Sequence, residues 1–329
     1  MKTEVLGTAT SEALEAAIAC AVGRLKSGDI VALPTETVYG LAADATDVAA
    51  VLRIFEAKAR PRFDPLIVHL PSPSALNSVI QSKIALTEIE YKLTEHFWPG
   101  PFTLVLSRNS VIPDIVVSGL PTVALRVSAH PLFGEIVRRL GRPIAAPSAN
   151  RFGNVSPTSA ADVLAELEFR IPLIVDGGRT EHGVESTIVA VRDGRIEILR
   201  PGPITEEQLR EFAPVHRATN PGSPDAPGQL PSHYAPTTPM ILCDDLALYA
   251  PHPGRRIGAL AWREPNELDF AESRVLSRSG DLREAGANLF RQLRELDAAN
   301  LDLIVAEAVP EVGLGHAIMD RLRRAATKR

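Results

Sequence analysis

A proline-rich stretch divides the sequence and most limits what the chain can fold into. Prolines recur through residues 213–239, at positions 214, 221, 224, 227, 231, 236 and 239, with glycines at 222 and 228. Proline lacks a backbone donor and fixes φ, so such a stretch cannot continue a helix or occupy a central strand. We therefore expect two domains, residues 1–212 and 240–329, joined by an extended linker over 213–239.

Apolar segments of strand length alternate with segments of helical periodicity on both sides of this stretch. In the first part, helices are expected over 11–26, where Ser11 can cap the N-terminus, and over 47–58. Strands are expected at 30–33 and 66–70. In the second part, the pattern predicts strands at 240–243, 257–262, 274–276 and 303–309, and helices around 281–300 and 316–328. Both parts are therefore expected to be α/β, the smaller one with a largely parallel sheet.

Charge and composition argue against several kinds of protein. A net charge of −5 provides no basic surface, so strong direct nucleic-acid binding is not expected. Cys20 and Cys243 stand far apart without metal-ligand spacing, so neither a disulfide framework nor a zinc site is indicated. There is no signal peptide and no apolar run of about eighteen residues, so we expect a cytoplasmic protein without membrane contact.

The common ATP-binding motifs are missing from the sequence. If ATP binds here, isolated cations and hydroxyls on loops must hold it. The candidates lie in proline-braced loops, next to predicted strands or, for Arg126, within one: Lys58, Arg60, Arg126, Ser148, Asn150 and Arg200. His69 and His182 have no second histidine or cysteine at ligand spacing, so a protein-held metal is not expected.

Each candidate also has a structural interpretation. Lys58 and Arg60 can simply complement a helix dipole, and the loop at Ser148 can be a surface turn. Arg126 interrupts an apolar strand and needs a partner, which is either a substrate carboxylate or phosphate or a protein Asp or Glu. The glycines between residues 176 and 187 can form a hairpin between two strands.

Several segments, taken in order, are more specific than any one of them. PTETVYGLAADA, KARPRFDPLIVHL, FWPGPFTLVL, VALRVSAHPL, APSANRFGNVSPT, DGGRTEHGVESTIV and ILRPGPIT closely resemble the YrdC-like domain of threonylcarbamoyl-AMP synthases. The strings PGQLPSHYAP and EAVPEVGLGHAIMDRLRRAA resemble the long, two-domain form of that family. The resemblance implies a YrdC-like twisted open sheet with a concave cavity, followed by a small Rossmann-like α/β domain.

The same resemblance implies an activity. Members of the family are nucleotidyltransferases that form L-threonylcarbamoyladenylate and pyrophosphate from L-threonine, bicarbonate and ATP, for the threonylcarbamoyladenosine modification of tRNA. Mg²⁺ is expected to arrive with ATP, held mainly by the triphosphate, because this ion keeps waters and few protein ligands. A threonylcarbamoyl transferase complex is the implied downstream partner.

Site residues also follow from the resemblance, position by position. The nucleotide is expected to contact Lys58, Arg60, Thr122, Ser148, Asn150, Ser156, Arg200 and Tyr234, with Lys58 and Arg60 stabilising the charge that develops during the reaction. L-Threonine is expected to contact Thr35, His69, Arg126 and Ser186, with Arg126 as the fork for its carboxylate. Asp64 departs from the family pattern, where asparagine is common, and is left out of the expected site.

The proline-rich segment is expected to do more than connect the domains. Residues 228–236 are expected to fold over the cavity as a lid, with Tyr234 against the ATP phosphates. Two other functions stay open at this stage. One is an RNA-binding, translation-associated module without catalysis, and the other is an acyl-adenylate or carbamoyl transferase that uses a different amine.

Overall fold

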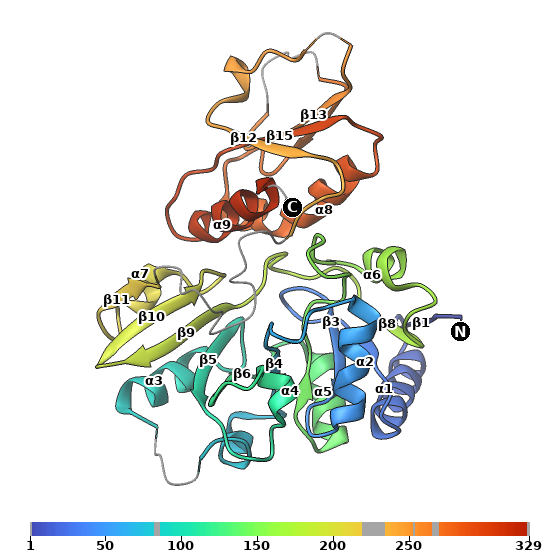
Figure 1. Cartoon of the computed structure of the whole chain (residues 1–329), viewed down its shortest axis with the longest axis vertical. Coiled ribbons are helices and arrows are strands. Elements are labelled where there is room, and N and C mark those ends of the chain that lie inside the picture. Colours follow the sequence, from blue (N-terminus) through green and yellow to red (C-terminus); the bar gives the residue numbers. More distant parts are fainter. Residues whose placement is uncertain (1, 82–85, 219–233, 253, 265–269, 328–329) are drawn as a thin grey trace.

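Two α/β domains make up the protein (Figure 1). The computed structural model describes residues 2–81, 86–218, 234–252, 254–264 and 270–327. The larger domain contains an eleven-stranded mixed sheet and the smaller one a four-stranded sheet. Helices of the smaller domain lie between its sheet and the larger domain (Figure 1).

The strands of the larger domain run in the order β1-β8-β2-β3-β7-β4-β6-β5-β9-β10-β11. They are β1 (Glu4–Gly7), β2 (Val31–Leu33), β3 (Gly40–Asp44), β4 (Ile67–His69), β5 (Phe102–Ser107), β6 (Thr122–Arg126), β7 (Ile144–Ala145), β8 (Leu173–Asp176), β9 (Thr187–Arg192), β10 (Arg195–Arg200) and β11 (Val215–Arg217). The helices are α1 (Ser11–Lys26), α2 (Val48–Lys58), α3 (Glu88–Phe97), α4 (Asp114–Val117), α5 (Pro131–Leu140), α6 (Ala160–Leu167) and α7 (Glu206–Leu209), with a 3₁₀ turn at Pro73–Ser78.

The central strands are buried on both faces, which explains their continuous apolar sequences. Val31 and Leu33 of β2 pack with α1 and α5 on one side of the sheet, whereas Ala32 between them packs with α2 on the other. Successive side chains of a strand point to opposite faces, so one short run supplies both cores.

The smaller domain has a parallel sheet in the order β12-β15-β13-β14. Its elements are β12 (Met240–Cys243), β13 (Ile257–Ala261), β14 (Glu272–Val275), β15 (Leu303–Glu307), α8 (Leu282–Asp297) and α9 (Gly315–Ala326), with a 3₁₀ turn at Leu246–Leu248. The predicted parallel α/β domain is thus confirmed.

The two domains share an apolar core. Val38, Val155 and Val184 of the larger domain pack in one cluster with side chains of α8 and α9. Gly183 has a φ of +66°, and a Cβ there would lie 2.5 Å from the carbonyl oxygen of Gly286 in α8. The loop before β9 therefore approaches α8 as closely as only glycine allows.

Two expectations for local structure need correction. Residues 213–239 are not an extended linker throughout, because β11 lies within them and pairs in parallel with β10. The hairpin considered for residues 176–187 is wrong: β8 pairs with β1 and β2, whereas β9 pairs with β5 and β10. The glycines therefore belong to a crossover between distant parts of the sheet.

Candidate functional site

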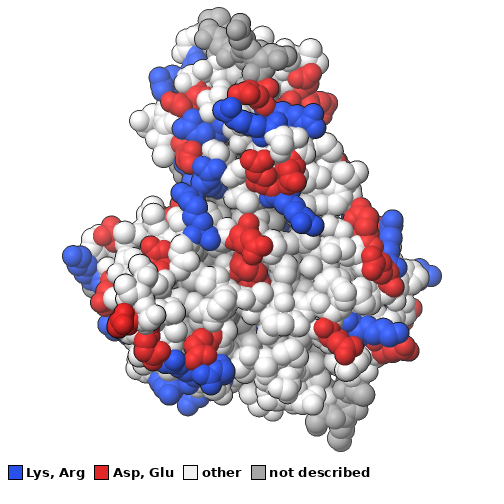
Figure 2. All heavy atoms as spheres, turned by 180° about the vertical axis from the view of Figure 1, so that it is seen from behind, with Lys and Arg blue, Asp and Glu red and all other residues white. Residues whose placement is uncertain are grey.

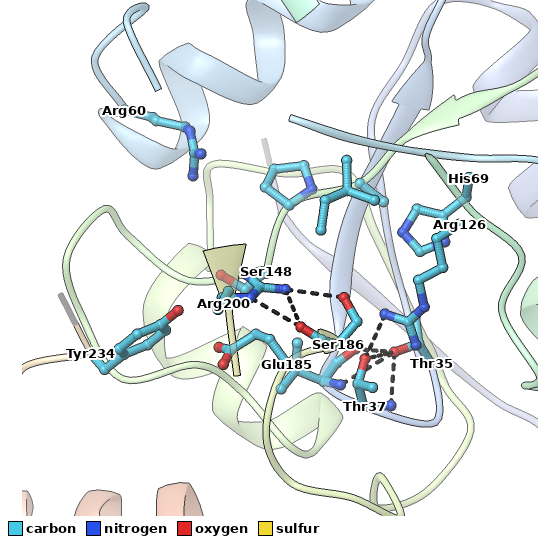
Figure 3. Close-up of a pocket in the computed structure, with 14 residues that line it drawn as sticks. Thr35, Thr37, Arg60, His69, Arg126, Ser148, Glu185, Ser186, Arg200 and Tyr234 are labelled. Carbon is cyan, nitrogen blue, oxygen red and sulfur yellow. Dashed lines mark hydrogen bonds between the residues drawn. The ribbon is translucent and has the colours of Figure 1, made fainter. Parts of the chain in front are cut away.

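A small cavity of about 50 Å³ lies where several strands of the larger sheet end (Figure 3). His69, Arg126 and Arg200 are the last residues of β4, β6 and β10. The full lining is Thr35, Thr37, Val38, Arg60, Ile67, His69, Arg126, Ala146, Pro147, Ser148, Glu185, Ser186, Arg200 and Tyr234. Carboxyl ends of strands are a frequent location for ligand sites in open α/β sheets, so this cavity is the candidate active site.

Parallel pairing brings His69 and Arg126 together. The two residues are opposite one another in the register of β4 and β6. The Arg126 guanidinium forms an ion pair with Glu36 at 2.6 Å and donates to Thr37 Oγ1 at 2.9 Å and to the Gly100 carbonyl at 3.2 Å. A protein carboxylate is therefore one partner of Arg126, and a substrate carboxylate would have to share the guanidinium with Glu36.

Glu36 is held ionised beside this arginine. Burial raises the pKa of its carboxyl, but the charge of Arg126 and a 2.5 Å hydrogen bond from Ser128 Oγ outweigh burial and lower the pKa to about 2. Thr35 supports the same turn, because its Oγ1 accepts from the backbone N–H of Thr37 and donates to the Val38 carbonyl. These hydrogen bonds therefore fix the side chains at the end of the cavity that is expected to bind L-threonine.

Ser186 and Arg200 lie between Tyr234 on one side of the cavity and His69 and Arg126 on the other (Figure 3). Arg200 Nη2 donates to the Ser186 carbonyl at 2.9 Å and to Ser186 Oγ at 3.0 Å, and Ser186 Oγ also lies 2.8 Å from Thr103 Oγ1. Among the described residues no carboxylate forms an ion pair with Arg200. Its positive charge is therefore available to a ligand.

Lys58 and Arg60 are placed by the end of α2. Ala59 adopts a left-handed conformation with φ of 51°, so the chain turns and the two cations diverge. Arg60 lines the cavity and is paired with buried Asp64 at 2.8 Å. Burial is the main cause that raises the pKa of Asp64, against the lowering effect of Arg60 and Lys58. Asp64 is thus a partner of Arg60 and does not line the cavity.

Lys58 lies behind the cavity wall. Its Nζ is fully buried and donates to the carbonyls of Ser148 and Asn150, both at 2.5 Å. Burial and the neighbouring charge of Arg60 lower the pKa of Lys58 well below its usual value. Asn150 and Ser156 are also buried outside the lining. Lys58 and Asn150 hold the Ser148 loop, whereas Ser156 donates to Glu185. Contact with a nucleotide stays a prediction for all three.

Thr122 is not brought to the cavity. It begins β6, where it pairs with Ser107, whereas Arg126 ends the same strand beside the cavity. Four residues of strand separate the two by about 13 Å at 3.3 Å per residue. Contact of Thr122 with a nucleotide also stays a prediction, without support from the cavity geometry.

Tyr234 reaches the cavity from the segment between the domains. Its ring is 1% exposed, lines the cavity and stacks on Phe290 of α8 at 5.6 Å, while the next backbone N–H, of Ala235, donates to the Gly153 carbonyl at 2.9 Å. The rest of the expected lid, residues 228–233, lies outside the described residues. The described part agrees with a segment that covers one end of the cavity.

Sequence reasoning missed two polar lining residues, Thr37 and Glu185, and also Glu36, which pairs with the lining residue Arg126. Glu36 and Thr37 stand in the first quoted segment, between Thr35 and Tyr39, and Glu185 immediately precedes Ser186. A carboxylate next to a predicted binding residue is the signal that was available. That signal applies to Glu36 and Glu185, and the fold shows what each residue contacts: Glu36 and Thr37 contact Arg126, and Glu185 pairs with Arg321.

Other features of the described residues bear on metals, membranes and nucleic acids. Within the residues described, no three His, Cys, Asp or Glu side chains cluster as metal ligands, and no helix is long and apolar enough to span a bilayer. Acidic and basic side chains are interspersed over the face seen in Figure 2. That the protein has no strong direct binding to nucleic acid stays an expectation.

His69 provides a test through pH. Burial, with a further contribution from Arg126, lowers its pKa to about 3, so the folded protein keeps this ring neutral where the unfolded chain protonates it near pH 6.5. The free energy of unfolding should therefore fall as pH drops from about 6.5 toward 3, by about 1.4 kcal/mol per pH unit from this group. Urea unfolding at pH 7, 6, 5 and 4 should show a shallower decline for His69→Gln.

The control for this experiment is His216→Gln, at a half-exposed position on β11. It should leave the pH dependence of stability unchanged. If the free energy of unfolding of His69→Gln fell with pH as steeply as that of wild type, the pKa of His69 in the folded protein would not be lowered.

The fold and cavity together define a class: a large mixed-sheet α/β domain with arginines at its strand ends, followed by a small parallel α/β domain. A family model for Sua5, YciO and YrdC described as "Telomere recombination" matches residues 24–202, and one described as "Threonylcarbamoyl-AMP synthase, C-terminal domain" matches residues 204–327. The chain belongs to the threonylcarbamoyl-AMP synthase family in its two-domain form.

Individual relatives agree with this assignment. The threonylcarbamoyl-AMP synthase of Bacillus subtilis is 40% identical over 94% of this chain and 92% of that protein. That of Pyrococcus abyssi is 38% identical over 94% and 93%. A crystal structure of P. abyssi Sua5 complexed with L-threonine superposes with a TM-score of 0.88 and 36% identity, over 98% of both chains.

These findings decide several expectations. The resemblance, the α/β fold with two domains and the membership of an enzyme family of the transferase class are confirmed. The boundaries at 212/213 and 239/240 stay predictions.

Proposed function

We propose that this protein forms L-threonylcarbamoyl-AMP and pyrophosphate from L-threonine, bicarbonate and ATP, for the threonylcarbamoyladenosine modification of tRNA. The observation that carries the proposal is the cavity itself, in which arginines from three elements converge with the hydroxyls of Thr35, Ser148 and Ser186. It is supported by family membership and by the P. abyssi relative, which was crystallised with L-threonine.

The first chemical step joins threonine to bicarbonate. The amine nitrogen forms a bond to the bicarbonate carbon, water leaves, and the product is a carbamate with one negative charge. Thr35, His69 and Arg126 surround this end of the cavity in Figure 3, where neutral His69 can accept or donate one hydrogen bond without adding charge. Their role is to orient the amine and the carboxylate.

The second step transfers the adenylyl group. A carbamate oxygen forms a bond to the α-phosphorus of ATP while the bond from that phosphorus to the pyrophosphate oxygen breaks, and pyrophosphate leaves with the electron pair. Arg200 and Arg60 lie where they can stabilise the charge that develops on the phosphates. Magnesium is part of the ATP substrate in this scheme and is held mainly by its phosphates.

The proposal also includes the surroundings of the reaction. We expect the enzyme to act in the cytoplasm and its labile product to be used by a threonylcarbamoyl transferase complex that modifies tRNA. The alternative of an RNA-binding module without catalysis is not favoured, because the chain has a net charge of −5 and belongs to a family named for a synthase.

A direct assay tests the proposal. The full chain is incubated with magnesium, ATP, labelled bicarbonate and each of the twenty amino acids in turn, and labelled adenylate and pyrophosphate are measured. Both should form with L-threonine. Product with a different amine instead would indicate another carbamoyl or acyl-adenylate transferase, and salt-sensitive RNA affinity without ATP consumption would indicate the binding module.

A further inference from the structure

Arg321 is an arginine at a core position of the smaller domain. It lies on α9 with 0% of its surface exposed, among Ala317, Ile318 and Leu322 of the same helix. Burying a guanidinium is costly unless its charge and its donors are satisfied. The helix therefore places a charge where its sequence pattern would place an apolar side chain.

The partners of Arg321 lie mostly across the domain boundary. Its Nε donates to Glu185 Oε2 at 3.0 Å, its Nη1 donates to the Pro201 carbonyl at 2.8 Å, and the guanidinium lies 5.2 Å from the ring centre of Tyr234. Within its own domain it contacts Asp320 at 2.9 Å, which also pairs with Arg324 at 2.9 Å. Arg321 thus faces the larger domain from α9.

Glu185 connects Arg321 to the candidate active site. The residue is 6% exposed, and it lines the cavity beside Ser186 and Arg200 (Figure 3). The oxygen that does not contact Arg321 accepts from Ser156 Oγ at 2.5 Å. An unneutralised carboxylate at this position would repel the phosphates of a nucleotide.

The charges around the cavity can be paired one by one. Arg60 is matched by Asp64 and Arg126 by Glu36, and each pair sums to zero. Glu185 is matched by Arg321, which leaves Arg200 as the one unmatched charge among the described lining residues. Without Arg321, the charges of Glu185 and Arg200 would cancel, and the cavity would lose its net attraction for an anion.

We propose that Arg321 is a positioning residue of the nucleotide site: the smaller domain inserts it behind Glu185, neutralises that carboxylate and so lets the cavity of the larger domain take a polyphosphate. This inference rests on the proposed function, because it assumes that phosphates occupy this cavity. It also assigns the smaller domain a part in substrate binding, in addition to holding Tyr234.

The test compares three variants of the full chain: Arg321→Met, Glu185→Gln and the double variant. Two quantities are measured, the KM for ATP during product formation and the Kd of inorganic pyrophosphate by calorimetry. Arg321→Met should raise both about tenfold or more, since it leaves a buried charge unpaired. The KM for L-threonine should change less than threefold, because the unpaired carboxylate is expected to repel phosphates, whereas L-threonine is expected to bind at the Arg126 end of the cavity.

Removal of the second charge should reverse the defect. Glutamine keeps the oxygen that accepts from Ser156, so the double variant should recover ATP KM and pyrophosphate Kd to within about threefold of wild type, whatever its melting temperature. Glu185→Gln alone should bind pyrophosphate at least as tightly as wild type. This single variant keeps Arg321 and remains informative if Arg321→Met does not fold.

The matched control is Arg323→Met on the same helix as Arg321, which removes a cation from an exposed ion pair with Glu311 in the segment before α9. It should leave both quantities unchanged. A double variant as defective as Arg321→Met, or weaker pyrophosphate binding by Glu185→Gln, would overturn the inference in favour of a purely structural pair. Charge-dependent pyrophosphate binding without product formation would retain the inference and reject the proposed function. A wild-type protein that binds no pyrophosphate would reject the inference.

Discussion

Replacing Arg126 with alanine is expected to lower the free energy of unfolding by about 3–5 kcal/mol, because it leaves the carboxylate of Glu36 buried without its partner. The two side chains are 4% and 7% exposed and their ion-pair atoms are 2.6 Å apart. Chemical denaturation at pH 7 measures the loss. Arg138→Ala, which removes an exposed partner of Glu135, should cost less than about 1 kcal/mol.

The pH dependence of this loss has a definite sign. The pKa of folded Glu36 is lowered to about 2, so its contribution is fully present above the unfolded value near 4.5 and is lost as pH falls through 2. The gap between wild type and Arg126→Ala should therefore narrow in acid. Adding Glu36→Gln should restore stability but not the KM for L-threonine. Equal stability of wild type and Arg126→Ala at pH 7 would contradict the buried pair.

Replacing Arg200 with methionine should lower kcat/KM for ATP by about 10²–10³-fold, the size of effect seen when one donor to a developing oxyanion is removed. Arg200 is expected to matter more than Arg60 or Arg126, since those two are already neutralised by Asp64 and Glu36. Initial rates of pyrophosphate release at varied ATP measure the effect.

The control for Arg200→Met is Arg217→Met, at an exposed position of β11 paired with Glu206. It should change kcat/KM less than about twofold. If Arg200→Met kept its kcat/KM within threefold of wild type while folding normally, the charge of Arg200 would not face the phosphates, and the assignment of the cavity's two ends would have to be revised.

Most of the local structure could be predicted because it depends on local patterns. Helical spacing places α1 and α2 at 11–26 and 47–58, close to the observed Ser11–Lys26 and Val48–Lys58. The order of strands in the sheet could not be predicted, because alternation identifies a strand without identifying its neighbours. The supposed hairpin between β8 and β9 failed for this reason.

Most residues of the site could be predicted from the sequence, but which side chains form ion pairs with one another could not. Arg126 could be recognised as a buried cation, but Glu36 lies 90 positions earlier in the chain and meets it only in the folded sheet. Thr122 shares a strand with Arg126, and linear sequence does not reveal that the cavity lies at only one end of it. Arg321 could have been noticed as an arginine at a position where helical spacing expects an apolar residue.

The neighbours of the first strand have a consequence for biosynthesis. β1 pairs with β8, and Thr3 Oγ1 donates to the Ile171 carbonyl, 168 residues away. A nascent chain emerging from the ribosome cannot pair its first strand until residue 176 has been made. β2 can pair with β3 earlier, but it lacks its other neighbour until β8 is made. Such distant pairings slow folding and leave apolar strands exposed during synthesis. A premature stop anywhere before β8 would therefore release a product with no completed sheet, suited to degradation or aggregation and not to partial activity.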